Sequence, residues 1–190
     1  MLRVIITSIL LGIGLAMDAC VVSMANGLRY PKITIKKILL IAIMFGLFQG
    51  LMPFIGYSLG SLFLSRIEEI IPFLSLFLLS IVGVRMLYEG IKNKAEEENY
   101  SSDLTWQVLF IQALATSIDA LSIGFTISNY SLFEALICVI LIAIITFIIC
   151  VGAVFIGKKF GTKLGNKASI LGGVILIGIG IEIFINGLFF

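Results

Sequence analysis

Six long apolar runs make up most of the chain, and short polar stretches separate them. Each run has about 20 residues or more, which is the length that an α-helix needs to cross the hydrocarbon core of a bilayer. The runs predict helices at roughly 4–26, 36–57, 70–91, 105–127, 132–156 and 167–189. The pattern therefore predicts an all-α membrane protein with six transmembrane helices and little chain outside the membrane.

The composition agrees with this pattern. Of the 190 residues, 60% are hydrophobic and 13% are charged, and there is no histidine. The mean hydropathy is +1.18, whereas a soluble domain of this length would need a larger charged surface. With a net charge of +2 and no cluster of basic and aromatic residues, the chain gives no reason to expect a nucleic-acid partner.

The first apolar run resembles a cleavable targeting signal, because a basic residue precedes it and Cys20 follows. Three features argue against cleavage: Asp18 within the run, Met17 three positions before the cysteine, and the apolar residues beyond it. All three cysteines, the others being Cys138 and Cys150, fall within predicted helices and show no CxxC spacing. We expect small buried side chains rather than disulfides or a zinc site.

The basic residues gather on one side of the predicted helices. Eleven of the thirteen lie at helix ends and in the loops after the first, third and fifth helices, and only Arg3 and Arg66 lie on the other side. Because positive residues are retained in the cytoplasm, we expect these three loops to be cytoplasmic and both termini to be external.

The longest polar stretch, residues 92–104, joins the third predicted helix to the fourth. It contains three consecutive glutamates at 96–98, but such a charge run is usually a solvated linker rather than a metal site. We therefore divide one membrane domain into a first half, 1–91, a cytoplasmic linker, 92–104, and a second half, 105–190.

Short motifs of the first half recur in the second half in the same order. The pairs are "AMDA" (16–19) with "SIDA" (117–120), "FIGYSLG" (54–60) with "FIGKKFG" (155–161), and "GVRMLYEG" (83–90) with "GIEIFING" (180–187). Each half holds three predicted helices, an odd number, so the two halves should have opposite orientations in the membrane. This predicts two inverted three-helix repeats, the plan of many secondary transporters, whose substrate binds near the bilayer midplane.

The repeat aligns Asp18 with Asp119, each roughly 15 residues into its predicted helix and thus near mid-depth at about 1.5 Å per residue. A charged residue there costs about 2.5–3.5 kcal/mol on insertion scales and normally faces the interior of a helix bundle. The pair predicts a site for protons or for a hard cation. The alternative is that each carboxyl group is only protonated or hydrogen-bonded to a neighbouring helix.

Oxygen-bearing side chains lie close to both aspartates in the sequence. The candidates for additional metal ligands or for a transport pathway are Ser23, Asn26, Thr116, Ser117 and Ser122. Carboxylate, hydroxyl, amide and backbone oxygens suit Mg²⁺, Ca²⁺ or Mn²⁺, whereas zinc and copper are less favoured without histidine or a cysteine pair. Thr116 and Ser122, three residues either side of the second aspartate, are predicted to lie on its helical face.

The second predicted helix contains Pro53, which could kink it, and Gln49 one turn earlier, which could line a pathway. Glycines four residues apart in this helix and the fifth predict close helix crossings. Arg85 and Glu182 hold matching places in the two repeats. They predict a salt bridge or gating pair, unless Arg85 instead extends to the cytoplasmic surface.

The motifs resemble those of the putative manganese efflux pump family (MntP), within the lysine-exporter-like (LysE) transporter superfamily. The resemblance covers essentially the whole chain and rests on "MDACVVSMANG" (17–27), "GVRMLYEG" (83–90), "ATSIDALSIG" (115–124) and "LGGVILIGIGI" (171–181). It implies a six-span exporter in the bacterial inner membrane that lowers cytoplasmic Mn²⁺.

By position, the resemblance makes Asp18 and Asp119 the central acidic residues, and Gly27, Arg85 and Glu89 match further motif positions. Two positions depart from the family pattern. A cysteine, residue 20, stands where an aromatic residue is expected, and a serine, residue 122, stands where a small apolar residue is usual.

We therefore expect a secondary transporter that exports Mn²⁺ by alternating access between the repeats, with proton exchange at the aspartates as a driving reaction and no cofactor. The chain contains no P-loop pattern, so ATP drive within it is not expected. Three alternatives stay open: an exporter of an amino acid or other small solute, a scaffold or sensor, and an intramembrane aspartyl protease. The protease would also use two aspartates, but neither aspartate here follows a glycine.

Overall fold

The computed structural model describes residues 1–59, 104–164 and 167–189, together with a few positions between 73 and 91. In these ranges the secondary structure is helical. The helices are α1 (Leu2–Arg29), α2 (Ile35–Leu59), α4 (Trp106–Ser117), α5 (Ala120–Thr126), α6 (Leu132–Leu164) and α7 (Lys167–Phe189). Arg85, Glu89 and nearly all of the 92–104 linker lie outside the described residues.

Four helical segments are long and apolar enough to cross a membrane, namely Leu2–Arg29, Ile35–Leu59, Trp106–Thr126 and Leu132–Gly161. They confirm four of the six predicted spans and make the chain a multi-pass membrane protein. The apolar part of α7, Ile170–Glu182, is shorter, and the predicted span at 70–91 lies largely outside the described residues.

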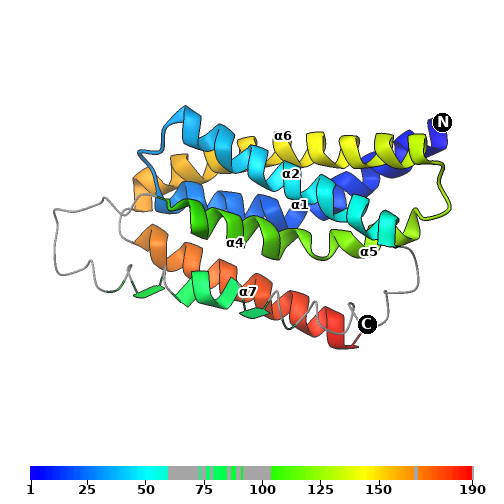
Figure 1. Cartoon of the computed structure of the whole chain (residues 1–190). Helices are drawn as coiled ribbons and strands as arrows, with labels where there is room; N and C mark the ends of the chain where they lie inside the picture. The colour runs from blue at the N-terminus through cyan, green and yellow to red at the C-terminus, as the bar shows by residue number, and fades with distance from the viewer. Residues whose placement is uncertain are drawn as a thin grey trace.

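The long helices run roughly along one common direction (Figure 1). The N- and C-termini lie at the same end of the bundle, and the connection from α1 to α2 and the end of α6 lie at the other. There the Nζ atom of Lys158 donates a hydrogen bond of 2.9 Å to the carbonyl oxygen of Ile33. The described loops that are rich in basic residues therefore meet at one end, and its assignment to the cytoplasm stays a prediction.

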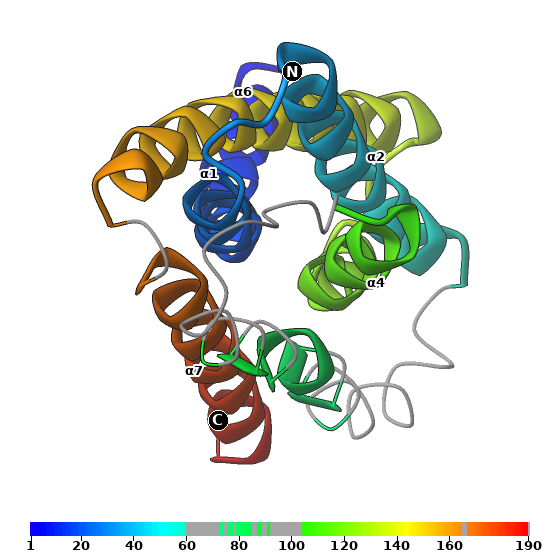
Figure 2. The same cartoon turned by 90° about the vertical axis from the view of Figure 1, so that its left-hand side faces the viewer.

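Helices of the first half pack chiefly against helices of the second half. α1 packs along α6 and also contacts α7 and α4, whereas α2 packs along α6, α5 and α4. Viewed from one end, α1 lies between α6, α4 and α7, and its direct contact with α2 is small (Figure 2). This arrangement brings residues from opposite halves of the sequence into one core.

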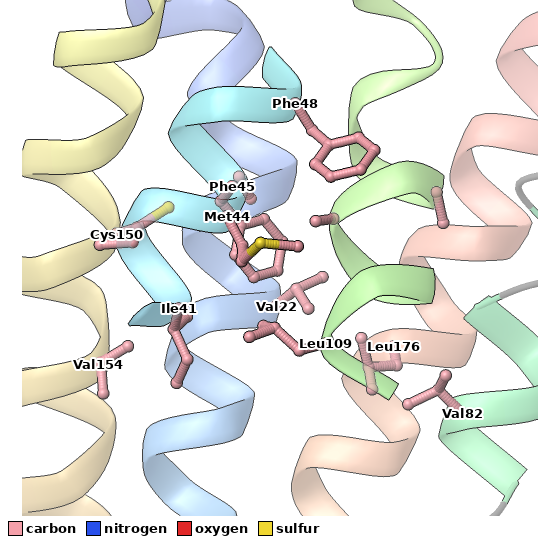
Figure 3. Packing of buried hydrophobic residues seen from close by; sticks show 14 of the residues in the cluster. Val22, Ile41, Met44, Phe45, Phe48, Val82, Leu109, Cys150, Val154 and Leu176 are labelled. Atoms are coloured by element: carbon pink, nitrogen blue, oxygen red, sulfur yellow. The ribbon is translucent and has the colours of Figure 1, made fainter. Parts of the chain in front are cut away.

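The core is a cluster of buried apolar side chains from α1, α2, α4, α6 and α7, joined by Leu79 and Val82 (Figure 3). Val22 of α1, Phe45 of α2, Leu109 of α4, Val154 of α6 and Leu176 of α7 are all among its members. The rings of Phe48 and Phe110 meet edge to face with a centroid distance of 5.2 Å. This ring contact thus defines how α2 and α4 are aligned with each other along the bundle axis.

Glycines make the closest helix crossings, as the spacing of small residues predicts. A Cβ atom on Gly157 of α6 would overlap the carbonyl oxygen of Met24 on α1, and one on Gly27 would lie 2.9 Å from the backbone nitrogen of Lys158. A Cβ atom on Gly56 of α2 would likewise overlap a carbonyl oxygen of α5. The predicted close crossings are confirmed at Gly56 and Gly157.

Candidate functional site

The second aspartate lies at a break in its membrane span, which the sequence did not predict. α4 ends at Ser117 and α5 begins at Ala120, but Ile118 and Asp119 keep helical backbone dihedrals, so the predicted span stays one apolar segment, Trp106–Thr126, with its hydrogen-bond pattern interrupted in the middle. Asp119 is the N-cap of α5, and its Oδ1 atom accepts a hydrogen bond of 2.8 Å from the backbone nitrogen of Ala120. An aspartate side chain can compete in this way with the regular helical hydrogen bonds.

The first aspartate, Asp18, lies within the continuous helix α1 and is half-buried. A pair of amide groups, one on α1 and one on α4, shows where it lies relative to Asp119. The Nδ2 atom of Asn26 donates to Oε1 of Gln112 at 2.8 Å, and Nε2 of Gln112 donates to Oδ1 of Asn26 at 3.3 Å. Both amides are buried. The pair shows that Asn26 of α1 and Gln112 of α4 lie at the same height along the bundle axis.

The two aspartates lie at nearly the same distance from this amide pair. Asp18 precedes Asn26 by eight residues and Asp119 follows Gln112 by seven, which is about 12 Å and about 10 Å along the helices. Because α1 and α4 run in opposite directions (Figure 1), both aspartates lie on the same side of the pair. The two aspartates therefore lie at one level of the bundle, on helical segments that are in contact.

A third carboxylate, that of Glu182, lies on α7, which packs against α1. Glu182 is exposed, and its predicted partner Arg85 lies outside the described residues, so the salt-bridge or gating pair stays a prediction. In the described part of the chain no group of three or more histidine, cysteine, aspartate or glutamate side chains could hold a metal ion. A metal bound at the aspartates would therefore need oxygen ligands of other kinds.

The hydroxyl groups of α4 are engaged with their own helix. Thr116 donates to the carbonyl oxygen of Gln112 at 2.9 Å, and Ser117 donates to that of Ala113 at 2.8 Å. Their oxygen atoms keep lone pairs that can accept a hydrogen bond or bind a cation. Ser122 follows the break and is half-buried on α5, and its predicted place on the helical face of Asp119 stays a prediction.

Ser23 is buried on a different face of α1 from Asp18. It lies beside Cys150 of α6, but its oxygen makes no hydrogen bond of good geometry. Five residues separate Ser23 from Asp18, which corresponds to about 140° around a helix. The structure therefore places Ser23 at the contact between α1 and α6 and not beside the aspartates.

Gln49 is buried on α2, and its Nε2 atom donates a hydrogen bond of 3.1 Å to the carbonyl oxygen of Leu15 on α1. Sequence reasoning missed three other buried polar residues, Ser8, Gln112 and Thr146. A signal existed for all three, since each is a polar residue within an otherwise apolar run. All three cysteines are free; Cys138 and Cys150 are buried as predicted, and Cys20 is half-buried.

The amide pair gives a first prediction, which concerns stability. Asn26→Ala and Gln112→Ala should each lower the free energy of unfolding by about 1–3 kcal/mol, because each leaves a buried amide without a partner. Joining them in a double variant should cost less than the sum of the two. Equilibrium unfolding in mixed detergents measures these values, with Ser58→Ala, which removes an exposed hydroxyl bonded within α2, as the control. Fully additive costs would mean that the two amides do not interact.

The chain has many relatives among known proteins. A family model described as "Putative manganese efflux pump" matches residues 32–184. The chain is 44% identical over 182 residues to the putative manganese efflux pump MntP of Ruminiclostridium cellulolyticum, covering 96% of each chain. It is 42% identical over 193 residues to the protein of the same name from Clostridium botulinum strain Loch Maree, covering 96% of this chain and 94% of the relative.

A similar match comes from outside the clostridia. The putative manganese efflux pump MntP of Campylobacter jejuni strain RM1221 is 42% identical over 182 residues, covering 96% of each chain. No solved structure matches the chain.

Proposed function

The chain belongs to the putative manganese efflux pump family, and on this premise we propose that it exports Mn²⁺ through a site formed by Asp18 and Asp119. The observation that carries the proposal is the placement of two carboxylates from opposite halves of the chain on the same side of the buried amide pair, at one level of a largely apolar bundle. The family is one of transporters and not of enzymes, which speaks against the aspartyl protease alternative.

The chemistry of the pair suits a divalent cation. Two carboxylates carry two negative charges, and held together in a low-dielectric interior they repel each other unless a cation or protons neutralise them. Carboxylate and neutral oxygens are the ligands that Mn²⁺ shares with Mg²⁺ and Ca²⁺. Such a site can exchange Mn²⁺ for protons, which would let a proton gradient drive export.

The glycine crossings support the inverted-repeat part of the proposal. Gly56 and Gly157 hold matching places in the repeated motifs "FIGYSLG" and "FIGKKFG". Gly56 packs on α5, which follows Asp119, whereas Gly157 packs on α1, which carries Asp18. Each repeat thus presents the same glycine to the aspartate-bearing span of the other. Rocking of the two halves about these crossings would expose the aspartates to each side in turn.

The test of the function is the manganese content of cells. The chain is produced in a bacterial host that lacks its own manganese exporter, the cells are challenged with Mn²⁺, and total manganese is measured by elemental analysis. Cells with the chain should hold less manganese than cells with an empty vector. Equal manganese contents at confirmed membrane expression would overturn the proposal, and the same cells would then be screened for other metals and for amino acids.

The proposed orientation can be tested separately, with Asn129→Cys between α5 and α6 and Lys32→Cys between α1 and α2. Both positions are exposed, and the three native cysteines are first replaced by serine or alanine. A membrane-impermeant thiol reagent should label Asn129→Cys in intact cells, and Lys32→Cys only after the cells are permeabilised. The reverse pattern would place both termini in the cytoplasm.

A further inference from the structure

Gln49 carries a buried side-chain oxygen that has no partner. Within the described residues, three buried side-chain atoms lack one, namely Ser23 Oγ, Gln49 Oε1 and Thr146 Oγ1. The side chain of Gln49 is fully buried, and a buried acceptor without a partner costs about 1–3 kcal/mol. An unpaired group of this kind calls for an explanation such as a bound water or ion.

The backbone of α2 frees a second oxygen at the same residue. In a regular helix the carbonyl oxygen of Gln49 would accept a hydrogen bond from the backbone nitrogen of residue 53. That residue is Pro53, which lies inside α2 and has no N–H group to donate. The carbonyl and Oε1 of one residue thus both lack their ordinary donors. In membrane proteins, backbone carbonyls without helical partners are tolerated where they are buried in protein or line a cavity, and in transporters such carbonyls coordinate ions.

The hydrogen bond to α1 brings the side-chain amide of Gln49 to the level of Asp18. Its Nε2 atom donates to the carbonyl oxygen of Leu15, which points along α1 toward the backbone nitrogen of Ala19. Asp18 is the residue just before Ala19 on the same helix. Because this bond uses the nitrogen of the amide, it leaves Oε1 as the free atom of the group.

The packing of α2 on the other half brings its backbone to the level of Asp119. One contact joins Phe48 to Phe110 of α4, and another joins Gly56 to Gly124 of α5. Asp119 lies between Phe110 and Gly124 along its span, and Gln49 and Pro53 lie between the matching contacts on α2. Counted back from the contact of Gly56 with Gly124, Gln49 lies seven residues along α2 and Asp119 five residues along its own span, about 10 Å and about 8 Å along helices that run in the same direction (Figure 1). Gln49 therefore lies near the level of both aspartates, on a third helix.

From this placement we propose that Gln49 is a neutral oxygen ligand of the cation that binds at Asp18 and Asp119, through Oε1 and its freed carbonyl oxygen. The inference rests on the proposed export site and adds a residue to it. Mn²⁺ prefers an octahedral set of oxygen ligands, which two monodentate carboxylates cannot complete. A neutral amide adds ligands without adding negative charge, so Mn²⁺ and the two aspartates stay balanced.

The test is Mn²⁺ binding to the purified protein, followed by the loss of the paramagnetic resonance signal of free Mn²⁺. Two substitutions separate the oxygen from the nitrogen of the amide. Gln49→Leu removes both, whereas Gln49→Glu keeps an oxygen at the same place and removes the group that donates to Leu15. Gln49→Leu should weaken binding by about tenfold or more, in line with the loss of a metal-site partner, and Gln49→Glu should bind at least as tightly as the wild type.

Two further variants complete the experiment. Pro53→Ala supplies an N–H group to the carbonyl of Gln49 and should weaken binding several-fold without lowering thermal stability. Tyr57→Phe removes the hydrogen bond from α2 to the carbonyl oxygen of Tyr130 and should leave Mn²⁺ binding unchanged. All proteins are first checked for a monodisperse profile and cooperative thermal unfolding.

The outcomes separate this inference from the function on which it rests. Equal affinity in Gln49→Leu and the wild type would overturn the ligand role, and so would an equal loss in Gln49→Leu and Gln49→Glu, which would indicate a structural role for the bond to Leu15. If Asp18→Asn also binds Mn²⁺ as tightly as the wild type, the aspartate site itself is wrong. If Asp18→Asn abolishes binding while Gln49→Leu has no effect, only the role of Gln49 is refuted.

Discussion

Asp18→Asn and Asp119→Asn are each expected to abolish manganese export and to return cell manganese to the empty-vector level. Asparagine has nearly the same shape as aspartate, but it brings no negative charge and cannot exchange protons. Removing either charge leaves one carboxylate, which no longer balances a divalent cation. Mn²⁺ affinity of the purified protein should fall by more than about 100-fold, because a direct ligand contributes more than the outer partners of a metal site, whose loss costs about 10–100-fold.

The substitution at Asp119 also separates charge from backbone geometry. Asparagine caps a helix about as well as aspartate does, so Asp119→Asn should keep the break between α4 and α5 while it removes the charge. Asp119→Ala removes the cap as well, and it should lower thermal stability in addition to export. Export by Asp119→Asn at the wild-type rate would show that the cap, and not the charge, is what the protein needs at this position.

A carboxylate outside the site provides the matched control. Glu134, near the start of α6, accepts hydrogen bonds from the backbone nitrogen and the hydroxyl of Ser131. Glu134→Gln makes the same chemical change in the same membrane protein, and it should export as the wild type does. If all three amide variants lost export equally, the loss would reflect damage to the protein in general rather than to a metal site.

The spans and their crossings could be predicted from the sequence because each depends on one simple property. Helices cross a bilayer when their apolar runs are long enough, and hydropathy measures that directly. Backbones approach closely where side chains are missing, so the spacing of Gly56 and Gly157 in their motifs already indicated where helices meet. Neither inference required knowledge of which helix would be the partner.

The geometry of the site could be predicted only in part, because it depends on partners that lie far away in the sequence. Asn26 was expected near a metal, but in the fold it bonds to Gln112, 86 residues away. The break at Asp119 could not be read from hydropathy, which is the same for a continuous and an interrupted span. The position of Ser23, by contrast, could be predicted from the sequence, because helix periodicity alone places it on a different face of α1 from Asp18.

Gln49 shows how a local feature and a distant contact combine. Its relation to Pro53 is visible in the sequence, because a proline always removes the donor for the carbonyl four residues earlier. Only the fold shows that its side-chain oxygen is unpaired. The Nε2 atom donates to the carbonyl oxygen of Leu15, and the Oε1 atom accepts no hydrogen bond. The sequence therefore points to the residue, but only the fold shows that Oε1 is its free atom.

Gly157→Ala is expected to be the most damaging of the conservative changes to the fold. A methyl group at this position would overlap the carbonyl oxygen of Met24 and lie 2.9 Å from the backbone nitrogen of Leu28. Both are backbone atoms of α1, so no side chain can rotate aside, and α1 and α6 must move apart along their contact. Overpacking typically costs about 1–3 kcal/mol, and the rigid backbone on both sides places this change at the upper end.

The same helix offers the control. Gly152 also lies in α6, and a Cβ atom there would meet nothing within 4 Å. Gly152→Ala should leave the free energy of unfolding unchanged or raise it by up to about 1 kcal/mol, since alanine is the better helix former. Equilibrium unfolding in mixed detergents compares the two, and Gly56→Ala should resemble Gly157→Ala because it makes the matching contact in the other half. If Gly157→Ala were as stable as Gly152→Ala, α1 and α6 would not be in close contact there, and the rocking motion proposed about this crossing would have no structural basis.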